Sequence, residues 1–337
     1  MAILSKLTKE YQTLAVVGMA KNAGKTTTLN YLIEKLRSGE RSIGITSTGR
    51  DGEPTDIVTG TSKPKIYLYE GMIVSVPTGL FKHATAELEI LQMTKYEVPL
   101  GTIMICRVVD EGYVQIAGPV FAAEQLSLAN DMRKFGAELI LIDGAVDRRA
   151  IASPKTADAI VLATGAVISR DIQKIAMETA HVMKLYSLSE IDDVTAKALE
   201  NREQITIINE KTLKELDVKT ALLASSLIDN EINEDTKYVY IPGALTSSVI
   251  ANIHPKKFKH TTFIVADATK IFLKSDEWNQ LIKKGLSVKV LKKIDIIAIS
   301  VNPMSPQGYV LEHEKLLKVM QEAMPDVEFF FARSVNE

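Results

Sequence analysis

Short apolar runs of strand length alternate along much of the chain with longer stretches in which apolar residues recur at helical spacing. The first repeat is an apolar run over 14–18, a glycine-containing turn, and a stretch over 26–36 with its leucines on one helical face. A second apolar run follows over 42–46. Strands that alternate with helices in this way build parallel sheets through crossover helices. The pattern predicts an α/β protein with a mostly parallel sheet flanked by helices.

The pattern becomes β-rich between about residues 64 and 118, which we interpret as an insertion in the first domain. Strands are expected in the apolar runs 66–69, 72–76 and 102–109. A hairpin is expected around 110–113, and a helix near 84–93.

The alternation of helices and strands resumes after this insertion. We expect helices over 122–135 and 169–185, and strands at 139–143 and 159–163. A charged, helical or irregular stretch over 186–235 then precedes a second α/β series, with strands at 238–241, 262–265, 294–299 and 329–331. A boundary near 210 gives domains over 1–210 and 211–337, and one extended sheet stays open as the alternative.

Composition and charge narrow the class of protein. The 337 residues suffice for about two domains, and 46% hydrophobic with 24% charged residues exclude a disordered or fibrous chain. Lys and Arg number 40 against 42 Asp and Glu, so a net charge of −2 provides no field to hold nucleic acid. The single cysteine, Cys106, cannot form an internal disulfide, and neither a secretory leader nor a membrane-spanning apolar run is evident. We expect a cytoplasmic protein without a membrane partner.

The string Gly18-Met-Ala-Lys-Asn-Ala-Gly-Lys-Thr-Thr27 lies between the first predicted strand and the first predicted helix. This context is typical of a phosphate-binding P-loop, in which glycines let backbone N–H groups converge at the positive end of a helix. Lys25 is expected to contact the β- and γ-phosphates, and the Thr26 hydroxyl to coordinate Mg²⁺. Nucleotide contacts are expected from Gly18, Lys21, Asn22, Ala23, Gly24, Lys25, Thr26 and Thr27. The structural alternative is a glycine turn beside a chance lysine.

A carboxylate at a neighbouring strand end is needed to hold Mg²⁺ or its water shell. The apolar run over 139–142 ends abruptly in Asp143, whose burial would be unfavourable without a cation. Asp143 is therefore an expected metal ligand. The alternative is an aspartate that caps the next turn.

The polar segment over 46–56 offers further candidates. Asp51 is expected to approach the γ-phosphate, and Arg50 to neutralise charge on a phosphate during transfer. A solvated turn that uses Asp and Gly for their backbone freedom explains the same residues. Arg148 and Arg149 are open to two interpretations as well, contact with phosphate or surface ion pairs.

Together these residues predict a site for a nucleoside triphosphate and Mg²⁺. Lys25, Asp51 and Asp143 are the expected catalytic residues, and Thr26, Asp51 and Asp143 the expected metal ligands. No Asn-Lys-x-Asp string that recognises guanine is present, which favours ATP without excluding GTP. The five histidines lack the paired spacing of a zinc site. We accordingly expect 1–210 to be a P-loop nucleotide-binding domain, and 211–337 a second α/β region that binds a partner.

The spacing of the glycine string resembles one branch of the P-loop proteins. Gly18 and Gly24 enclose five residues where four are usual, and Met19 takes the usual first-glycine position. Such a lengthened loop resembles that of dethiobiotin synthetase and its relatives, a branch that also contains partition ATPases and metallochaperone GTPases. Partition ATPases use an extra lysine five residues before the P-loop lysine, and here Lys21 stands four residues before Lys25.

Four further strings resemble the small, P-loop-bearing subunit of the reactivating factor for lysine 5,6-aminomutase, an adenosylcobalamin enzyme. They lie at 141–149, 163–170, 241–245 and 301–308. The resemblance implies a chaperone-like ATPase that releases damaged cobalamin from the mutase, with a second reactivase subunit and the aminomutase as its partners. It also implies a switch in which loops ordered by Mg²⁺ and phosphate collapse on hydrolysis.

Two other functions stay open. One is an ATP-dependent ligase resembling dethiobiotin synthetase, in which Lys21 and the 46–56 segment bind a small carboxylate that ATP activates as an acyl phosphate. The other is a nucleotide-binding sensor or scaffold without turnover. The three functions differ in nucleotide turnover, which depends on a protein partner in the first, depends on a small acid in the second and is absent in the third.

Overall fold

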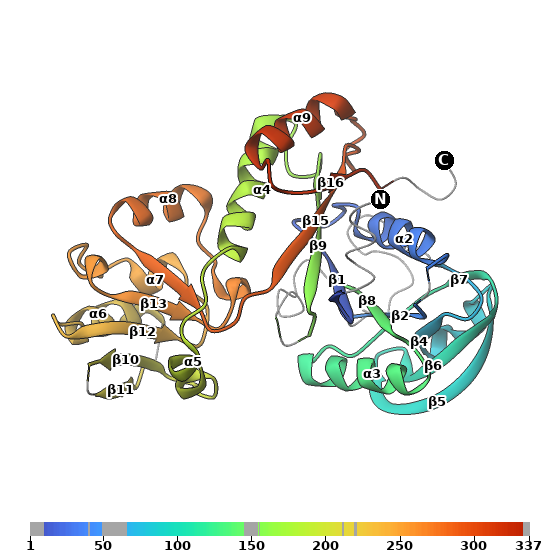
Figure 1. Ribbon diagram of the computed structural model, residues 1–337, viewed down its shortest axis with the longest axis horizontal. Coiled ribbons are helices and arrows are strands. Elements are labelled where there is room, and N and C mark those ends of the chain that lie inside the picture. The colour runs from blue at the N-terminus through green and yellow to red at the C-terminus, as the bar shows by residue number, and fades with distance from the viewer. Residues whose placement is uncertain are drawn as a thin grey trace. The chain divides into compact units, whose positions relative to one another are not determined.

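The computed structural model describes residues 10–39, 41–48, 66–144, 154, 156–210, 212–218 and 221–332. The chain divides into two compact units, Met1–Ala176 with Ile296–Glu337, and Met177–Asp295. The chain leaves the first unit within helix α4 (Ile172–Tyr186) and returns to it in strand β15 (Asp295–Asn302) (Figure 1). The predicted division at 210 is therefore wrong, because the end of the chain completes the first unit.

A nine-stranded sheet forms the centre of the first unit, in the order β16-β15-β9-β1-β8-β2-β4-β6-β5. Its other strands are β1 (Thr13–Gly18), β2 (Ile43–Ser47), β4 (Ile73–Pro77), β5 (Glu87–Val98), β6 (Gly101–Asp110), β8 (Leu139–Asp143), β9 (Ala159–Gly165) and β16 (Phe329–Phe330). Strand β1 pairs in parallel with β8 and β9, and β2 pairs in parallel with β8 and β4. Among the pairings described within this sheet, only those of β6 with β4 and β5 are antiparallel. The predicted α/β class with a mostly parallel sheet is confirmed.

Helices cover both faces of this sheet (Figure 1). Helix α2 (Lys25–Leu36) buries Leu29 and Leu32 in one cluster with Leu14 of β1. Burial of each such leucine contributes about 1.5–3 kcal/mol, which fixes α2 against the sheet. Helix α3 (Ala122–Lys134) covers the other face, where a Cβ added to Gly44 would lie 3.2 Å from Met132 Cε. Helix α9 (His313–Ala323) completes the unit.

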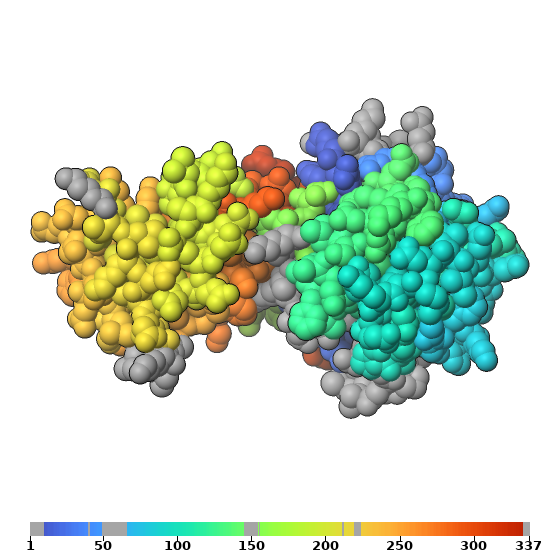
Figure 2. Space-filling view, turned by 90° about the horizontal axis from the view of Figure 1, so that it is seen from below, coloured from blue at the N-terminus to red at the C-terminus, as the bar shows by residue number. Residues whose placement is uncertain are grey.

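The β-rich insertion is present, but two of its predicted elements are wrong. The residues predicted as a helix near 84–93 instead begin β5, after a 3-10 helix at Thr78–His83. Leucines at 88 and 91 fit helical spacing as well as a strand, and antiparallel pairing with β6 decides for the strand. No hairpin closes at 110–113, because β7 (Gly112–Val114) pairs with β3 (Ile66–Leu68). Figure 2 shows β5 beside α3.

A five-stranded sheet in the order β11-β10-β12-β13-β14 forms the second unit. Its strands are β10 (Ile205–Asn209), β11 (Leu213–Leu216), β12 (Thr236–Ile241), β13 (Thr262–Val265) and β14 (Ser287–Val290). Its helices are α5 (Asp193–Leu199), α6 (Ala221–Glu231), α7 (Ser247–Ile250) and α8 (Ser275–Lys283), with 3-10 turns at Lys257–Lys259 and Ala268–Lys270. Phe263, Phe258 and Trp278 are buried in its core. The predicted strands at 238–241 and 262–265 are confirmed here, whereas the one at 294–299 joins the first sheet as β15.

Candidate functional site

The segment between β1 and α2, residues 18–24, makes a tight turn that we call the glycine turn. Gly24 is the N-cap of α2 and has φ 93°, and Asn22 has φ 63°. Both values lie in the left-handed region, which glycine adopts without strain and asparagine tolerates better than most residues. The sequence therefore suits the turn at the two positions where its backbone is most demanding.

Lys25, the first residue of α2, folds back across the end of β1. A Cβ added to Gly18 would lie 2.9 Å from Lys25 Cγ and 3.1 Å from its Cδ. Glycine at 18 thus leaves room for the aliphatic part of the lysine side chain. The lysine is partly exposed, while Ala23 beneath the turn is buried.

Backbone N–H groups of the first α2 turn point toward the glycine turn. The bond from Thr28 N to Gly24 O, at 2.9 Å, is the first of the helix, and the N–H groups before it have no acceptor within the helix. The end of a helix where such groups gather carries about half a positive charge. Thr26 and Thr27, both partly exposed, lie in this turn. The local field therefore favours an anion.

Asp143, the last residue of β8, lies at the same edge of the sheet. Strand β8 is next to β1, and Asp143 is in register with Val16. Within the described part of the chain Asp143 Oδ1 is buried and has no hydrogen-bond partner. Burial raises the pKa of Asp143 to about 6, and the Lys25 ammonium partly opposes that rise. A carboxylate that is desolvated and lacks a donor is a site where a cation would bind favourably.

The backbone carbonyl of Asp143 is held firmly, in contrast to its side chain. Thr48 donates to it from its N, at 3.1 Å, and from Oγ1, at 3.2 Å. Ser47 Oγ donates to it at 3.3 Å. The end of β2 therefore fixes the backbone at Asp143.

Asn302 is a neighbour of the glycine turn that the sequence analysis did not single out. A Cβ added to Gly24 would lie 3.1 Å from both Cβ and Nδ2 of Asn302. Gly165, at the end of β9, also lies against Asn302, because a Cβ there would lie only 1.9 Å from the Asn302 carbonyl oxygen. The only signal in the sequence was the 301–308 string, whose place in the fold depends on the return of β15 to the first sheet.

Two buried hydroxyl groups, those of Thr28 and Ser300, connect the glycine turn to β15. Thr28 Oγ1 contacts Gly24 O at 2.9 Å and Ser300 Oγ at 2.8 Å. Both hydroxyl residues are almost fully buried. The turn is thereby tied to β15 through side chains as well as through packing.

The fold thus brings part of the predicted site together and leaves part of it outside the described residues. Gathered at one edge of the sheet are Gly18, Lys21, Asn22, Ala23, Gly24, Lys25, Thr26, Thr27 and Asp143. Outside the described residues are Asp51, Arg50, Arg148 and Arg149. Among the residues that are described, no group of three or more His, Cys, Asp or Glu side chains could hold a metal ion. A cation at Asp143 would need hydroxyl, water or phosphate oxygens as further ligands.

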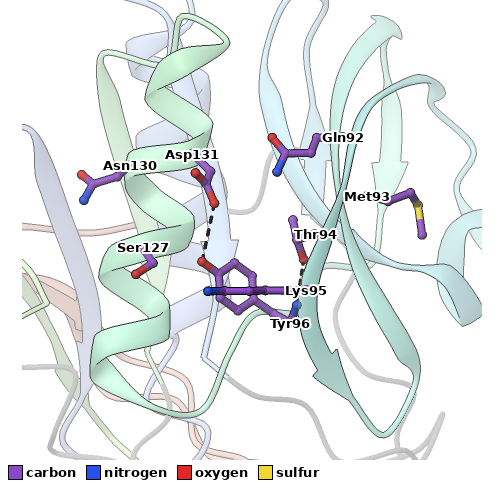
Figure 3. Close-up of a pocket in the computed structure, with 8 residues that line it drawn as sticks. All are labelled: Gln92, Met93, Thr94, Lys95, Tyr96, Ser127, Asn130 and Asp131. Carbon is purple, nitrogen blue, oxygen red and sulfur yellow. Dashed lines mark hydrogen bonds between the residues drawn. The ribbon is translucent and has the colours of Figure 1, made fainter.

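A concavity of about 510 Å³ lies between β5 and α3, apart from the glycine turn (Figure 3). Its polar groups are largely bonded to one another or to the backbone. Asp131 accepts from Lys134 at 2.7 Å and from Tyr96 at 3.5 Å, and Thr94 donates to Ile103 O at 2.7 Å. We therefore place the candidate site at the glycine turn.

Comparisons of the chain with models of protein families, with curated proteins and with solved structures found no match. Across the residues described, no helix is both long enough and apolar enough to cross a bilayer.

Proposed function

We propose that the chain is a Mg²⁺-dependent nucleoside triphosphatase of the P-loop class, with ATP as its preferred nucleotide. The observation that carries the proposal is the return of Lys25 across Gly18 toward Asp143, whose buried Oδ1 has no hydrogen-bond partner among the described residues. A lysine, a helix N-terminus and an aspartate at one sheet edge are what a triphosphate with its cation requires. A turn that serves only to connect a strand to a helix needs neither the lysine nor the aspartate.

Each residue of the site has a part in this activity. The N–H groups of the glycine turn and of the first α2 turn would hold the phosphates, and Lys25 would neutralise their negative charge. Asp143 and Thr26 fit the cation, since one supplies a desolvated carboxylate and the other a hydroxyl oxygen. Bound Mg²⁺ would withdraw charge from the phosphoryl oxygens. Because the pKa of Asp143 is about 6, this carboxyl releases its proton near neutral pH, as a metal ligand must.

We further propose that turnover is coupled to a partner protein, in the manner of the aminomutase-reactivating factors that the sequence resembles. Two of the four resembling strings lie near the turn: 301–308 contains Asn302, which is close to Gly24, and 163–170 contains Gly165, which is close to Asn302. One connection to the second unit starts at this edge, since α4 follows β9, and the other is β15, which leaves the second unit at Asp295 and ends at Asn302 beside the turn. A change at the phosphates would therefore act on the segments that lead to the second unit.

Binding of a fluorescent ATP analogue with and without Mg²⁺ tests the nucleotide site. Lys25→Ala is expected to weaken binding roughly 10- to 100-fold, because a charged hydrogen-bonding group is lost. Thr26→Ala should mainly weaken the dependence on Mg²⁺. Lys35→Ala, at the exposed end of the same helix, removes the same charge and serves as the control. Unchanged affinity in Lys25→Ala would reject the site.

Turnover assays distinguish the coupled functions. Rescue of a hydroxocobalamin-inactivated aminomutase that needs ATP and is absent in Lys25→Ala would support the reactivase. ADP release that depends on an added small acid, without a protein partner, would instead support a ligase. Tight ATP binding with no turnover under either addition would support a sensor.

A further inference from the structure

Gln125, in the first turn of α3, is a buried amide with no partner among the described residues. The residue is fully buried, and neither Oε1 nor Nε2 makes a hydrogen bond. A primary amide offers two donors and an acceptor with two lone pairs, so leaving all of them unbonded in the interior is costly. Methionine has nearly the same length and would avoid this cost. Packing alone therefore does not explain a glutamine at this position.

The amide lies against the carboxyl end of β2. A Cβ added to Gly118 would lie 1.9 Å from Ser47 O, 2.7 Å from Thr46 Oγ1 and 3.1 Å from Gln125 Oε1. Three oxygen atoms, two from β2 and one from α3, thus surround one glycine. Oε1 of Gln125 and Oγ1 of Thr46 are therefore less than about 6 Å apart, a separation that one water hydrogen-bonded to both spans.

Thr46 belongs to a chain of buried hydroxyls. Ser75 Oγ lies 2.7 Å from Thr46 Oγ1 and 2.7 Å from Ala117 O. The chain joins β2 and β4 to the segment that leads into α3. The Gln125 amide lies next to this chain. Together with Thr46 and Ser75 it forms a buried polar cluster at the end of β2.

The residues that follow Thr46 are those that fix Asp143. Ser47 and Thr48 donate three hydrogen bonds to the Asp143 carbonyl. A group that holds Thr46 and the Ser47 carbonyl in place therefore also holds the backbone of Asp143 in place. The position of that backbone determines where the Asp143 carboxylate meets a cation. Gln125 lies on the α3 side of the sheet, away from Lys25, and would act through β2 alone.

We propose that Gln125 is a positioning residue of the nucleotide site, which holds the end of β2 in register with Asp143 through a water that bridges its amide to Thr46. The catalytic part of this inference rests on the proposed nucleotide function. The link from Gln125 to Thr48 does not, because it involves only groups of the chain and water.

The first test is Gln125→Met, which removes the donors and the acceptor and keeps the length of the side chain. We expect a melting temperature that is unchanged or a few degrees higher, and ATP binding without Mg²⁺ within about twofold of wild type. The Mg²⁺ concentration for half-maximal turnover should rise about tenfold, as when other groups that orient a metal ligand are removed. Ser127→Ala, an exposed hydroxyl that is bonded to Ala123 O farther along α3, is the matched control and should change neither quantity.

The second test is hydrogen exchange at the Thr48 amide, measured without nucleotide. Protection of this N–H should fall about tenfold in Gln125→Met although global stability does not fall. Thr46→Val should lower it similarly, and the double variant should be no worse than either single variant, because both changes break one bridge.

The two proposals fail in different ways. If wild type binds no nucleotide but Thr48 exchange responds as described, the nucleotide function is wrong and the positioning role of Gln125 stands. If wild type hydrolyses ATP but Gln125→Met keeps both the Mg²⁺ dependence and the Thr48 protection of wild type, the role of Gln125 is wrong. Additive effects in the double variant would exclude the shared water.

Discussion

Asp143→Asn separates the stability of the fold from the chemistry of the site. The substitution keeps the shape of the side chain and removes the charge that burial disfavours. Asp143 Oδ1 is buried and has no partner among the described residues. Asparagine should therefore be tolerated at this position in the absence of Mg²⁺, and should even stabilise the chain.

The sign and size of the effect follow from the pKa of Asp143, which burial raises from 3.8 to about 6. Folding favours the protonated carboxyl, so the wild type is least penalised below pH 4 and loses stability as the pH rises through about 6. The difference between the two pKa values corresponds to about 3 kcal/mol. The residue as a whole is partly exposed, and solvent screening reduces that figure, so we expect about 1–3 kcal/mol.

Urea unfolding at pH 4 and pH 8 without Mg²⁺ measures this effect as a difference between wild type and Asp143→Asn. The two proteins should be similar at the lower pH, and the variant more stable by the amount above at the higher pH. With saturating MgATP the order should reverse, because ligand bound only by folded wild type adds to its stability. Asp326→Asn, an exposed aspartate in the same unit, is the control for loss of charge.

Three results would refute the reasoning. A variant as stable as wild type at both pH values would mean that the Asp143 carboxylate is not penalised by burial. A variant that is less stable at pH 8 without Mg²⁺ would mean that the carboxylate has a stabilising partner in the folded chain. An equal gain from MgATP in both proteins would place the cation elsewhere.

Three further predictions concern the supports of the site and the division of the chain. Gly24→Ala should lower the free energy of unfolding by about 1–2 kcal/mol in urea and weaken ATP binding, because φ is 93° and Asn302 is close; wild-type affinity would contradict this. Thr28→Val should cost about 1–3 kcal/mol by calorimetry, and combination with Ser300→Ala should cost less than the sum of the single changes. Phe263→Ala should destabilise the second unit by about 3–5 kcal/mol in urea unfolding, with ATP affinity within about twofold of wild type; a large loss of affinity would show that the site depends on that unit.

Local patterns in the sequence were enough to predict the elements that carry the candidate site. An apolar run, a glycine string and a helical face predicted β1, the glycine turn and α2. The predicted bounds of the strand and the helix agree with the observed ones to within a few residues. The apolar run that ends in Asp143 defines β8 in the same way. These predictions succeeded because strand length, left-handed turn positions and helical spacing are properties of neighbouring residues.

Tertiary contacts decided what neighbouring residues left ambiguous. Leucines at 88 and 91 suit a helix or a strand, and pairing with β6 selects the strand. The apolar run at 294–299 is a strand in either sheet, and only the return of the chain to β9 places Asn302 beside Gly24. Gln125 has no signature at all in an amphipathic helix, since its lack of partners is a property of the packed interior. The sequence by itself therefore determined where the glycine turn, its flanking strand and helix, and the strand that ends in Asp143 lie along the chain. The folded chain decided which distant side chains surround them, because contacts between distant segments depend on which strands pair.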